Sequence, residues 1–235
     1  MTAELRVHPD AVALGAALAG EIRRRYEATT GLFLLGCPSG RTMRTTYRAL
    51  GEWRFERMVV VAMDEYVDAP YDAHFSCARF AHQEIAGPLG VPADQVWMPD
   101  ATAPEELDRR IESAGGIDLF LLASGASDGH VAFVPPGSPR DGATAVLELA
   151  ESTRRDNLAT FPLFRSLDDV PRRGVSVGLG TIGAARALRM VLLGAGKREA
   201  AARLLALAAF DPGWPASIVH DHPDAEIWLD REARP

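Results

Sequence analysis

The chain has 235 residues, of which 47% are hydrophobic and 24% charged, and its net charge is −7. This composition is ordinary for a globular protein, and the acidic balance argues against general binding to nucleic acid or to a membrane surface. No apolar run approaches the roughly 20 residues that span a bilayer, and the N-terminus has no signal-peptide pattern. Cys37 and Cys77, the two cysteines, make no disulfide framework, so we expect a reducing, cytoplasmic location.

The first half of the chain alternates helical and strand patterns. Leu14, Leu18 and Ile22 recur at helical spacing and predict a helix over residues 9–27. Short apolar runs predict buried strands at 31–35 and 58–63. The other predicted elements of this half are helices over 43–53, 76–86 and 104–113.

The second half continues the alternation. An apolar run at 117–122 predicts a buried central strand, and further strands are predicted at 144–149, 174–180, 189–194 and 225–230. Residues 153–164 fit a short helix or an irregular cover, and an Ala/Leu-rich helix ends near residue 209. Strands that alternate with helices indicate a doubly wound, mostly parallel, Rossmann-like α/β sheet with helices on both faces. We expect residues 1–235 to form a single domain, with a small subdomain accommodated near residues 140–170.

Polar side chains follow the central strand at the sheet edge where open α/β proteins bind ligands. Asp128 and His130 flank Gly129, and glycine permits a positive φ between them. A carboxylate beside an imidazole fixes its tautomer and makes an oriented acid–base pair. The alternative is an ordinary turn in which the Asp caps the backbone and the His packs.

Two other turns have features of a phosphate site. The loop Ser39-Gly40-Arg41-Thr42 joins a strand to a helix, an arrangement whose backbone N–H groups and hydroxyls can cradle a phosphate. An ordinary capped turn is the alternative, because the loop matches neither common glycine-rich phosphate motif. Lys197 is the single lysine among 25 Lys and Arg residues and follows a predicted strand. It suits a phosphate as a compact charge, unless it is a chance survivor of an Arg-rich composition.

Asp64 and Glu65 directly follow the second predicted strand and precede Tyr66. These carboxylates indicate either a solvated turn or a catalytic base with a tuned pKa. His74 and His82 are interpreted as structural or surface residues. No cluster of His, Cys, Asp and Glu has a recognised metal-ligand spacing, so no metal is predicted.

Several segments, taken together and in order, resemble one known family. They are Leu35–Thr42 with Thr45–Tyr47, Met63–Tyr66, Asp128–Phe133, Thr153–Asn157, Val177–Thr181, Leu193–Lys197, and Trp214 ahead of His222-Pro223. Over almost its whole length the chain resembles the glucosamine-6-phosphate deaminase (isomerase) family, and more loosely its relatives the 6-phosphogluconolactonases. The resemblance implies a sugar-phosphate isomerase type of fold and a phosphosugar substrate. It also implies conversion of glucosamine 6-phosphate and water to fructose 6-phosphate and ammonium, without a cofactor.

The resemblance also implies residue roles. Asp64 matches the carboxylate that moves a proton between C2 and C1 through an enediol-type intermediate. His130 matches the residue that opens the sugar ring, with Asp128 as its carboxylate partner. The substrate-binding residues are expected to be Ser39, Gly40, Arg41, Thr42, Gly129 and Lys197.

The chain departs from the deaminase pattern at several positions. Val134–Pro136 stands where deaminases carry Asn-Glu-Pro, so the Glu that assists the ring-opening His is missing. Ser124 and Ala126 replace glycines, and the Arg expected on the phosphate falls on Ala159. Arg41 stands where Gly is common and is a candidate for the missing positive charge.

The first hypothesis is a deaminase/isomerase acting on glucosamine 6-phosphate or galactosamine 6-phosphate. The alternatives are a 6-phosphogluconolactonase-like hydrolase, an isomerase of another sugar phosphate, and a non-catalytic sugar-phosphate-binding paralogue. Lactonases also lack the Glu and share the character of the tail from Pro215 to Asp230, but they rarely carry the Met63–Tyr66 segment. Because the chain ends soon after its last predicted strand, we expect a monomer or small homo-oligomer.

Overall fold

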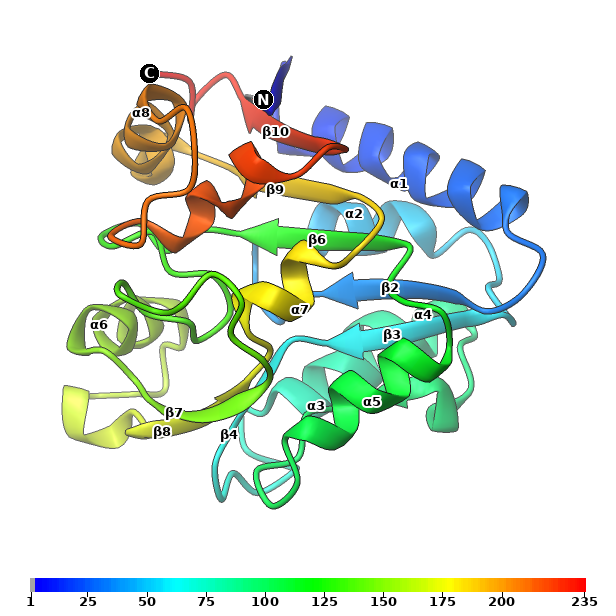
Figure 1. Cartoon of the computed structure of the whole chain (residues 1–235), viewed down its shortest axis with the longest axis horizontal. Helices are drawn as coiled ribbons and strands as arrows, with labels where there is room; N and C mark the ends of the chain where they lie inside the picture. Colours follow the sequence, from blue (N-terminus) through cyan, green and yellow to red (C-terminus); the bar gives the residue numbers. More distant parts are fainter. Residues whose placement is uncertain (1–2) are drawn as a thin grey trace.

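The computed structural model describes residues 3–235 and is built around a seven-stranded sheet of order β1-β10-β9-β6-β2-β3-β5 (Figure 1). All neighbouring strands in it are parallel, which confirms the predicted doubly wound α/β class. The strands are β1 (Glu4–His8), β2 (Phe33–Cys37), β3 (Met58–Ala62), β5 (Val96–Trp97), β6 (Leu119–Ala123), β9 (Leu188–Leu192) and β10 (Ala225–Asp230).

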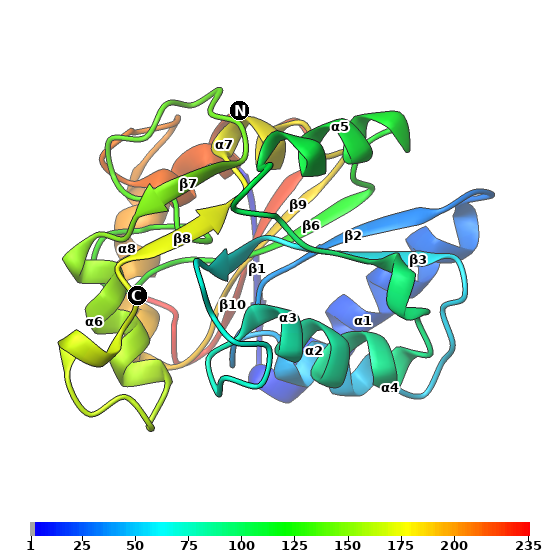
Figure 2. The same cartoon turned by 90° about the horizontal axis from the view of Figure 1, so that it is seen from below.

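Helices cover both faces of this sheet, as the view along its edge shows (Figure 2). On one face lie α1 (Ala11–Ala28), α2 (Arg44–Leu50), and a continuous helical segment made of α3 (Cys77–Phe80), a π-helical turn (Ala81–Ala86) and α4 (Gly87–Leu89). On the other lie α5 (Glu105–Ser113), α7 (Leu179–Gly183), α8 (Arg198–Ala206) and the 3₁₀ helix Pro215–Asp221. None of the helices in residues 3–235 is long and apolar enough to cross a membrane.

The central strands are apolar at every position because both of their faces are buried. In β3, Met58 and Val60 contribute to the core under α1 and α2, whereas Val59 and Val61 contribute to the core under α5 and α7. This alternation is the two-residue period of a β-strand, and it explains why the run carries no polar residue.

The predicted helices and main-sheet strands are found with shifted ends, apart from the run at 174–180. The first helix begins at Ala11 rather than at residue 9, because Asp10 caps it by accepting hydrogen bonds from the backbone N–H groups of Val12 and Ala13. The segment left open at 153–164 is helical as α6 (Glu151–Thr160). The short strands β1 and β5 were not predicted.

A second, antiparallel sheet joins β4 (Asp64–Tyr66), β8 (Arg173–Ser176) and β7 (Ala145–Glu148) in the order β4-β8-β7. The prediction of one buried strand over residues 174–180 was therefore wrong. The strand ends at Ser176 and belongs to this small sheet, and the chain turns into α7 at Leu179. A Cβ on Gly178 would lie 2.0 Å from the carbonyl oxygen of Gly142, so the glycine allows the backbone to pack there instead of extending the strand.

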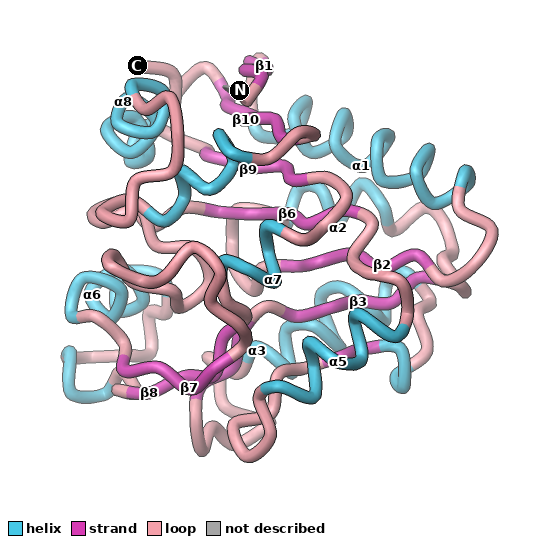
Figure 3. Tube along the Cα trace, in the orientation of Figure 1, coloured by secondary structure: helices cyan, strands magenta, loops and turns pink. Residues whose placement is uncertain are grey.

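The strand order reverses between β2 and β6. From β2 the chain proceeds to β3 and β5 on one side, then crosses back to β6 on the other side of β2 (Figure 3). In a doubly wound sheet this switch point leaves a crevice at the carboxyl ends of the two strands. The loops that follow β2 and β6 contain the predicted phosphate loop and the Asp128–His130 turn.

Candidate active site

A pocket of about 200 Å³ opens at this switch point. Its walls come from the loop after β2, from β4, from the loop after β6, from α6 and from the turn after β9. Most of the residues predicted from the sequence line it, namely Ser39, Gly40, Arg41, Thr42, Asp64, His130 and Lys197. Asp128 and Gly129 do not line the pocket.

Asp64 enters the pocket from β4, where it pairs with Ser176 of β8. Only 7% of the residue is exposed. Burial raises the pKa of the Asp64 carboxyl, a hydrogen bond from the Cys77 thiol lowers it in part, and the charge of Glu65 raises it. The net result is a pKa of about 7 in place of the ordinary 3.8. A carboxyl group in this range can take up and release a proton near neutral pH.

Glu65, the adjacent carboxylate, has a structural place. It accepts hydrogen bonds from the backbone N–H groups of Tyr66, Cys77 and Ala78 and from the Ser76 hydroxyl, at 2.8–3.1 Å. These contacts satisfy N–H groups at the start of α3, which no helical carbonyl can reach. Of the two carboxylates, only Asp64 lines the pocket.

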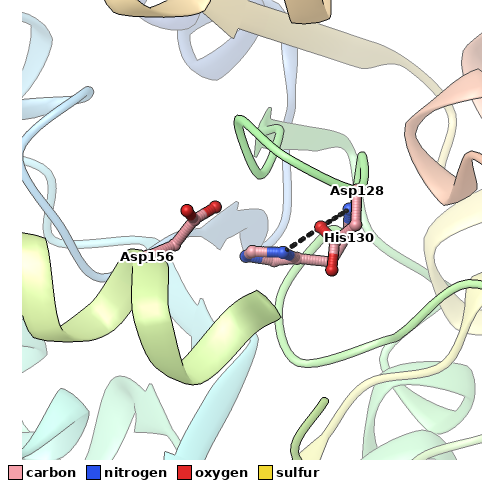
Figure 4. Close-up of side chains that lie close together, drawn as sticks. All are labelled: Asp128, His130 and Asp156. Carbon is pink, nitrogen blue, oxygen red and sulfur yellow. Dashed lines mark hydrogen bonds and ion pairs between the residues drawn. The ribbon is translucent and has the colours of Figure 1, made fainter. Parts of the chain in front are cut away.

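Asp128 and His130 form a close pair (Figure 4). Asp128 Oδ1 lies 2.6 Å from His130 Nδ1 and 3.1 Å from the backbone nitrogen of His130. Burial by itself would raise the pKa of Asp128, but the hydrogen bonds and charge of His130 and a hydrogen bond from Ser152 hold it well below its usual range. A carboxylate at Nδ1 orients the ring and leaves Nε2 as the nitrogen that can exchange a proton with a ligand.

Glycines allow the close packing of this turn. A Cβ on Gly125 would lie 2.2 Å from His130 Nδ1. Gly129 has a φ of 69°, and a Cβ there would lie 2.3 Å from the indole ring of Trp214. Gly129 thus faces Trp214 and not the pocket, so its predicted contact with substrate has no counterpart in this geometry.

Two cationic side chains line the pocket. Lys197 donates a hydrogen bond from Nζ to the carbonyl oxygen of Ser124 at 2.7 Å. Burial lowers the pKa of Lys197, the charges of Asp156 and Asp128 oppose this, and Arg41 lowers it further. Arg41 extends from the loop after β2 and donates a hydrogen bond from Nη2 to the carbonyl oxygen of Ala159 at 3.4 Å. Together they provide positive charge for an anionic ligand.

Helix α6 contributes residues to which the sequence assigned no role. Ser152 donates a hydrogen bond to Asp128 Oδ2, and Thr153 Oγ1 lies 3.3 Å from His130 Nδ1. Asp156 and Asn157 line the pocket. The Thr153–Asn157 segment carried part of the family resemblance, but a sequence pattern alone did not place this helix against the Asp128–His130 turn.

Among residues 3–235, three side chains lie close enough together to share a cation, namely Asp128, His130 and Asp156. Asp128 already accepts hydrogen bonds at both carboxylate oxygens, and His130 Nδ1 is paired with it. Asp156 also uses one oxygen, accepting a hydrogen bond from the backbone N–H of Ala126 at 3.0 Å. The group is therefore organised by mutual hydrogen bonds, and the remaining free atoms are suited to proton transfer.

The fold and the pocket define the protein as a doubly wound α/β protein with carboxyl, imidazole and cationic groups gathered at the switch point. The family model for "Glucosamine-6-phosphate isomerases/6-phosphogluconolactonase" matches residues 9–228. The chain belongs to this family, which confirms the resemblance inferred from the motifs.

Individual relatives agree with this membership. A glucosamine-6-phosphate deaminase of Shouchella clausii (strain KSM-K16) is 35% identical over 211 residues, which cover 85% of this chain and 83% of that protein. A solved structure described as a monomeric glucosamine-6-phosphate deaminase is 25% identical, with a TM-score of 0.90 and 98% of each chain covered. The 6-phosphogluconolactonase of Trypanosoma brucei, at 19% identity and a TM-score of 0.77 over 99% of this chain and 97% of that one, shares the fold.

Proposed function

We propose that this protein is a sugar-phosphate deaminase/isomerase that converts an amino-hexose 6-phosphate and water to a ketose 6-phosphate and ammonium. The observation that carries the proposal is the place of Asp64. It is a nearly buried carboxyl group with a pKa raised to about 7, in the same pocket as His130 and the cations Arg41 and Lys197. Family membership and the named relatives support the same reaction.

Asp64 is proposed as the base that moves the proton. After the ring opens, it removes the proton from C2 of the aldehyde form and returns it to C1. The C1–C2 bond becomes double and then single again, and the aldehyde oxygen gains a proton from solvent to become the C1 hydroxyl. C2 is left as an iminium that water hydrolyses to the ketone and ammonium. A base with a pKa near the working pH is well matched to both halves of this transfer.

His130 is proposed as the group that opens the sugar ring, and Asp128 as the residue that positions it. The Asp128 carboxylate at Nδ1 holds the ring in one orientation, so that Nε2 can protonate the ring oxygen. Gly129 supports this turn through its positive φ and its packing on Trp214.

We propose that the phosphate binds to the loop Ser39–Thr42, which includes Arg41, and to Lys197. The two cations lie on different elements that border the same pocket. Binding energy from a phosphate far from C1 and C2 can hold the reacting carbons in register with Asp64.

We also propose that the chain folds as one domain and acts as a monomer. In support, the first and last strands, β1 and β10, pair with each other in the central sheet. The similar solved structure at a TM-score of 0.90 is described as monomeric. Size-exclusion chromatography with light scattering tests the monomer.

The test is an assay of ammonium release with glucosamine 6-phosphate and galactosamine 6-phosphate, run beside hydrolysis of 6-phosphogluconolactone. We expect ammonium release that is lost in Asp64→Asn and in His130→Ala. Glu151→Gln is the matched control, because it removes an exposed carboxylate of α6 that pairs with Arg155 outside the pocket. Lactone hydrolysis without ammonium release would contradict the proposal and assign the protein to lactone chemistry.

A further inference from the structure

Asp156 is a carboxylate in the pocket that the proposed mechanism leaves unused. It lies on α6, lines the pocket, and accepts one hydrogen bond, from the backbone N–H of Ala126 to Oδ2 at 3.0 Å. Within residues 3–235 no Lys, Arg or His nitrogen approaches its carboxylate within the 4.0 Å of an ion pair. One of its oxygens is thus free to meet a ligand.

The helix brings this carboxylate to the working end of His130. Ser152 and Asp156 are four residues apart, so they lie on the same face of α6. Ser152 contacts Asp128, and a carboxylate oxygen of Asp156 lies within 4.8 Å of a ring nitrogen of His130. Figure 4 shows Asp128 at the Nδ1 side of the imidazole and Asp156 beyond the opposite end of the ring.

Opening a cyclic sugar requires two proton transfers, one at each of the two oxygens bonded to C1. The ring oxygen must gain a proton, and the anomeric hydroxyl must lose one, as the bond between C1 and the ring oxygen breaks. His130 has one nitrogen available, because Nδ1 is held by Asp128. A second group beside Nε2 can therefore serve the second oxygen that is bonded to the same carbon.

We propose that Asp156 is a catalytic residue of ring opening, which accepts the proton of the anomeric hydroxyl while His130 protonates the ring oxygen. The C1–O bond of the hydroxyl becomes the carbonyl, the bond from C1 to the ring oxygen breaks, and no other reactant is needed. This inference rests on the proposed function. It gives His130 a second carboxylate partner, besides Asp128, in a chain whose segment Val134–Pro136 lacks the family's Glu.

The experiment separates ring opening from deamination. In the Asp64→Asn protein the proton transfer at C2 is blocked, but the sugar ring can still open and close. Exchange NMR of glucosamine 6-phosphate measures the interconversion of its α and β anomers, which passes through the open form. We expect the Asp64→Asn protein to accelerate this interconversion over buffer.

Adding Asp156→Asn to this protein should lower the acceleration by a factor of about 100 or more, the usual contribution of a general base. The asparagine oxygen can still accept the hydrogen bond from Ala126, so the substitution removes basicity and leaves the local packing in place. Asp156→Glu, which keeps a carboxylate, should retain part of the acceleration. Glu151→Gln on the same helix should leave it unchanged.

Unchanged interconversion in the Asp64→Asn/Asp156→Asn protein would overturn the proposal. Equal losses in the Asp156→Asn and Glu151→Gln versions would also overturn it, because they would trace the effect to the charge of α6. Binding of inorganic phosphate, measured by calorimetry, should persist in each variant and shows that the pocket is folded. A wild-type protein that accelerates interconversion but releases no ammonium would contradict the deaminase proposal alone.

Discussion

The guanidinium of Arg41 donates a hydrogen bond to the backbone carbonyl of Ala159, at 3.4 Å. It therefore places a positive charge beside a position at which related deaminases are expected to carry an arginine and this chain has none. Arg41 comes from the loop after β2, and Ala159 from the last turn of α6. The positive charge at this edge of the pocket therefore comes from the loop after β2 and not from α6. The proposal for phosphate binding depends on this charge.

Replacing Arg41 by Ala should raise the KM for the phosphosugar about 10- to 100-fold, with a smaller change in kcat. A hydrogen bond to a charged group contributes about 1.5–3 kcal/mol, and about 1.4 kcal/mol is a factor of ten. Steady-state kinetics of ammonium release measures both constants. Arg48→Ala is the matched control, since Arg48 lies exposed on α2 and does not line the pocket.

A second arginine variant tests whether charge at this edge is what matters. Arg41→Ala combined with Ala159→Arg restores a guanidinium from the side of α6. We expect it to recover a large part of the lost affinity. A KM that does not change in Arg41→Ala would contradict the place of this residue in the phosphate site.

The rate should depend on pH through Asp64. As a base, Asp64 acts in its ionised form, and burial holds its pKa at about 7. We expect kcat/KM to rise with pH and to level off above about pH 7. The substrate phosphate also titrates, with a second pKa near 6. The pH dependence of inhibition by inorganic phosphate measures this effect, and the kcat/KM profile is corrected for it. A corrected profile that is flat from pH 5 to 8 would contradict the assignment.

The same carboxyl group should make the protein less stable as the pH rises. Its pKa in the folded protein, about 7, lies above its ordinary value of 3.8, so the folded state holds a proton that the unfolded state has released. The stability from this proton is complete below pH 3.8 and is lost as the pH rises through 7. At 1.36 kcal/mol for each pH unit, the loss between pH 5 and 8 is at most about 3 kcal/mol.

Asp64→Asn should remove this pH dependence. Denaturant unfolding at pH 5 and at pH 8 should show the variant gaining free energy of unfolding over the wild type at the higher pH. Asp72→Asn, at an exposed aspartate, should show no such gain. Parallel pH curves for the wild type and Asp64→Asn would rule out a raised pKa at this position.

Lys197 can be tested chemically, because it is the one lysine of the chain. Burial lowers its pKa, which increases the fraction of neutral, nucleophilic amine at mildly alkaline pH. We expect reductive methylation at pH 8 to modify Lys197 and to weaken phosphosugar binding, and a saturating sugar phosphate to protect it. Mass spectrometry separates this residue from the N-terminal amine. Complete modification with an unchanged KM would exclude Lys197 from the phosphate site.

Gly129→Ala should destabilise the Asp128–His130 turn. The φ of 69° is strained for alanine, and its Cβ would meet Trp214 at 2.3 Å. Strain and overpacking each cost about 1–3 kcal/mol, so we expect a loss of about 2–6 kcal/mol in the free energy of unfolding. Gly137→Ala is the control, because Gly137 has a φ of 87° but a Cβ there would meet no atom within 4 Å. Equal losses of unfolding free energy in both variants would show that contact with Trp214 does not add to the destabilisation by Gly129→Ala.

Much of the fold could be predicted because its signals are local. A strand buried on both faces reads as a short apolar run, as in Met58–Ala62 and Leu119–Ala123. The α1 helix repeats Leu14, Leu18 and Ile22 on one buried face. Such periods arise within a few neighbouring residues, so they determined the α/β class and placed the polar turns at the ends of strands.

The small antiparallel sheet was not predicted, because it depends on partners far apart in sequence. Asp64 pairs with Ser176, and Glu148 of β7 pairs with Arg173 of β8. Pairing across such distances leaves no local period. It determines, however, that Asp64 is buried in the pocket, and burial is the main cause of its raised pKa.

The sequence by itself determined the alternating elements, the family and the residue types available for proton transfer and for binding an anion. Only the tertiary structure decided how they combine. It separated Asp64 from Glu65, which caps α3, and it brought Asp156 to His130 and Arg41 to Ala159. The physical reason is that pKa, hydrogen bonding and charge at a site depend on what packs around each group, and the packing partners come from distant parts of the chain.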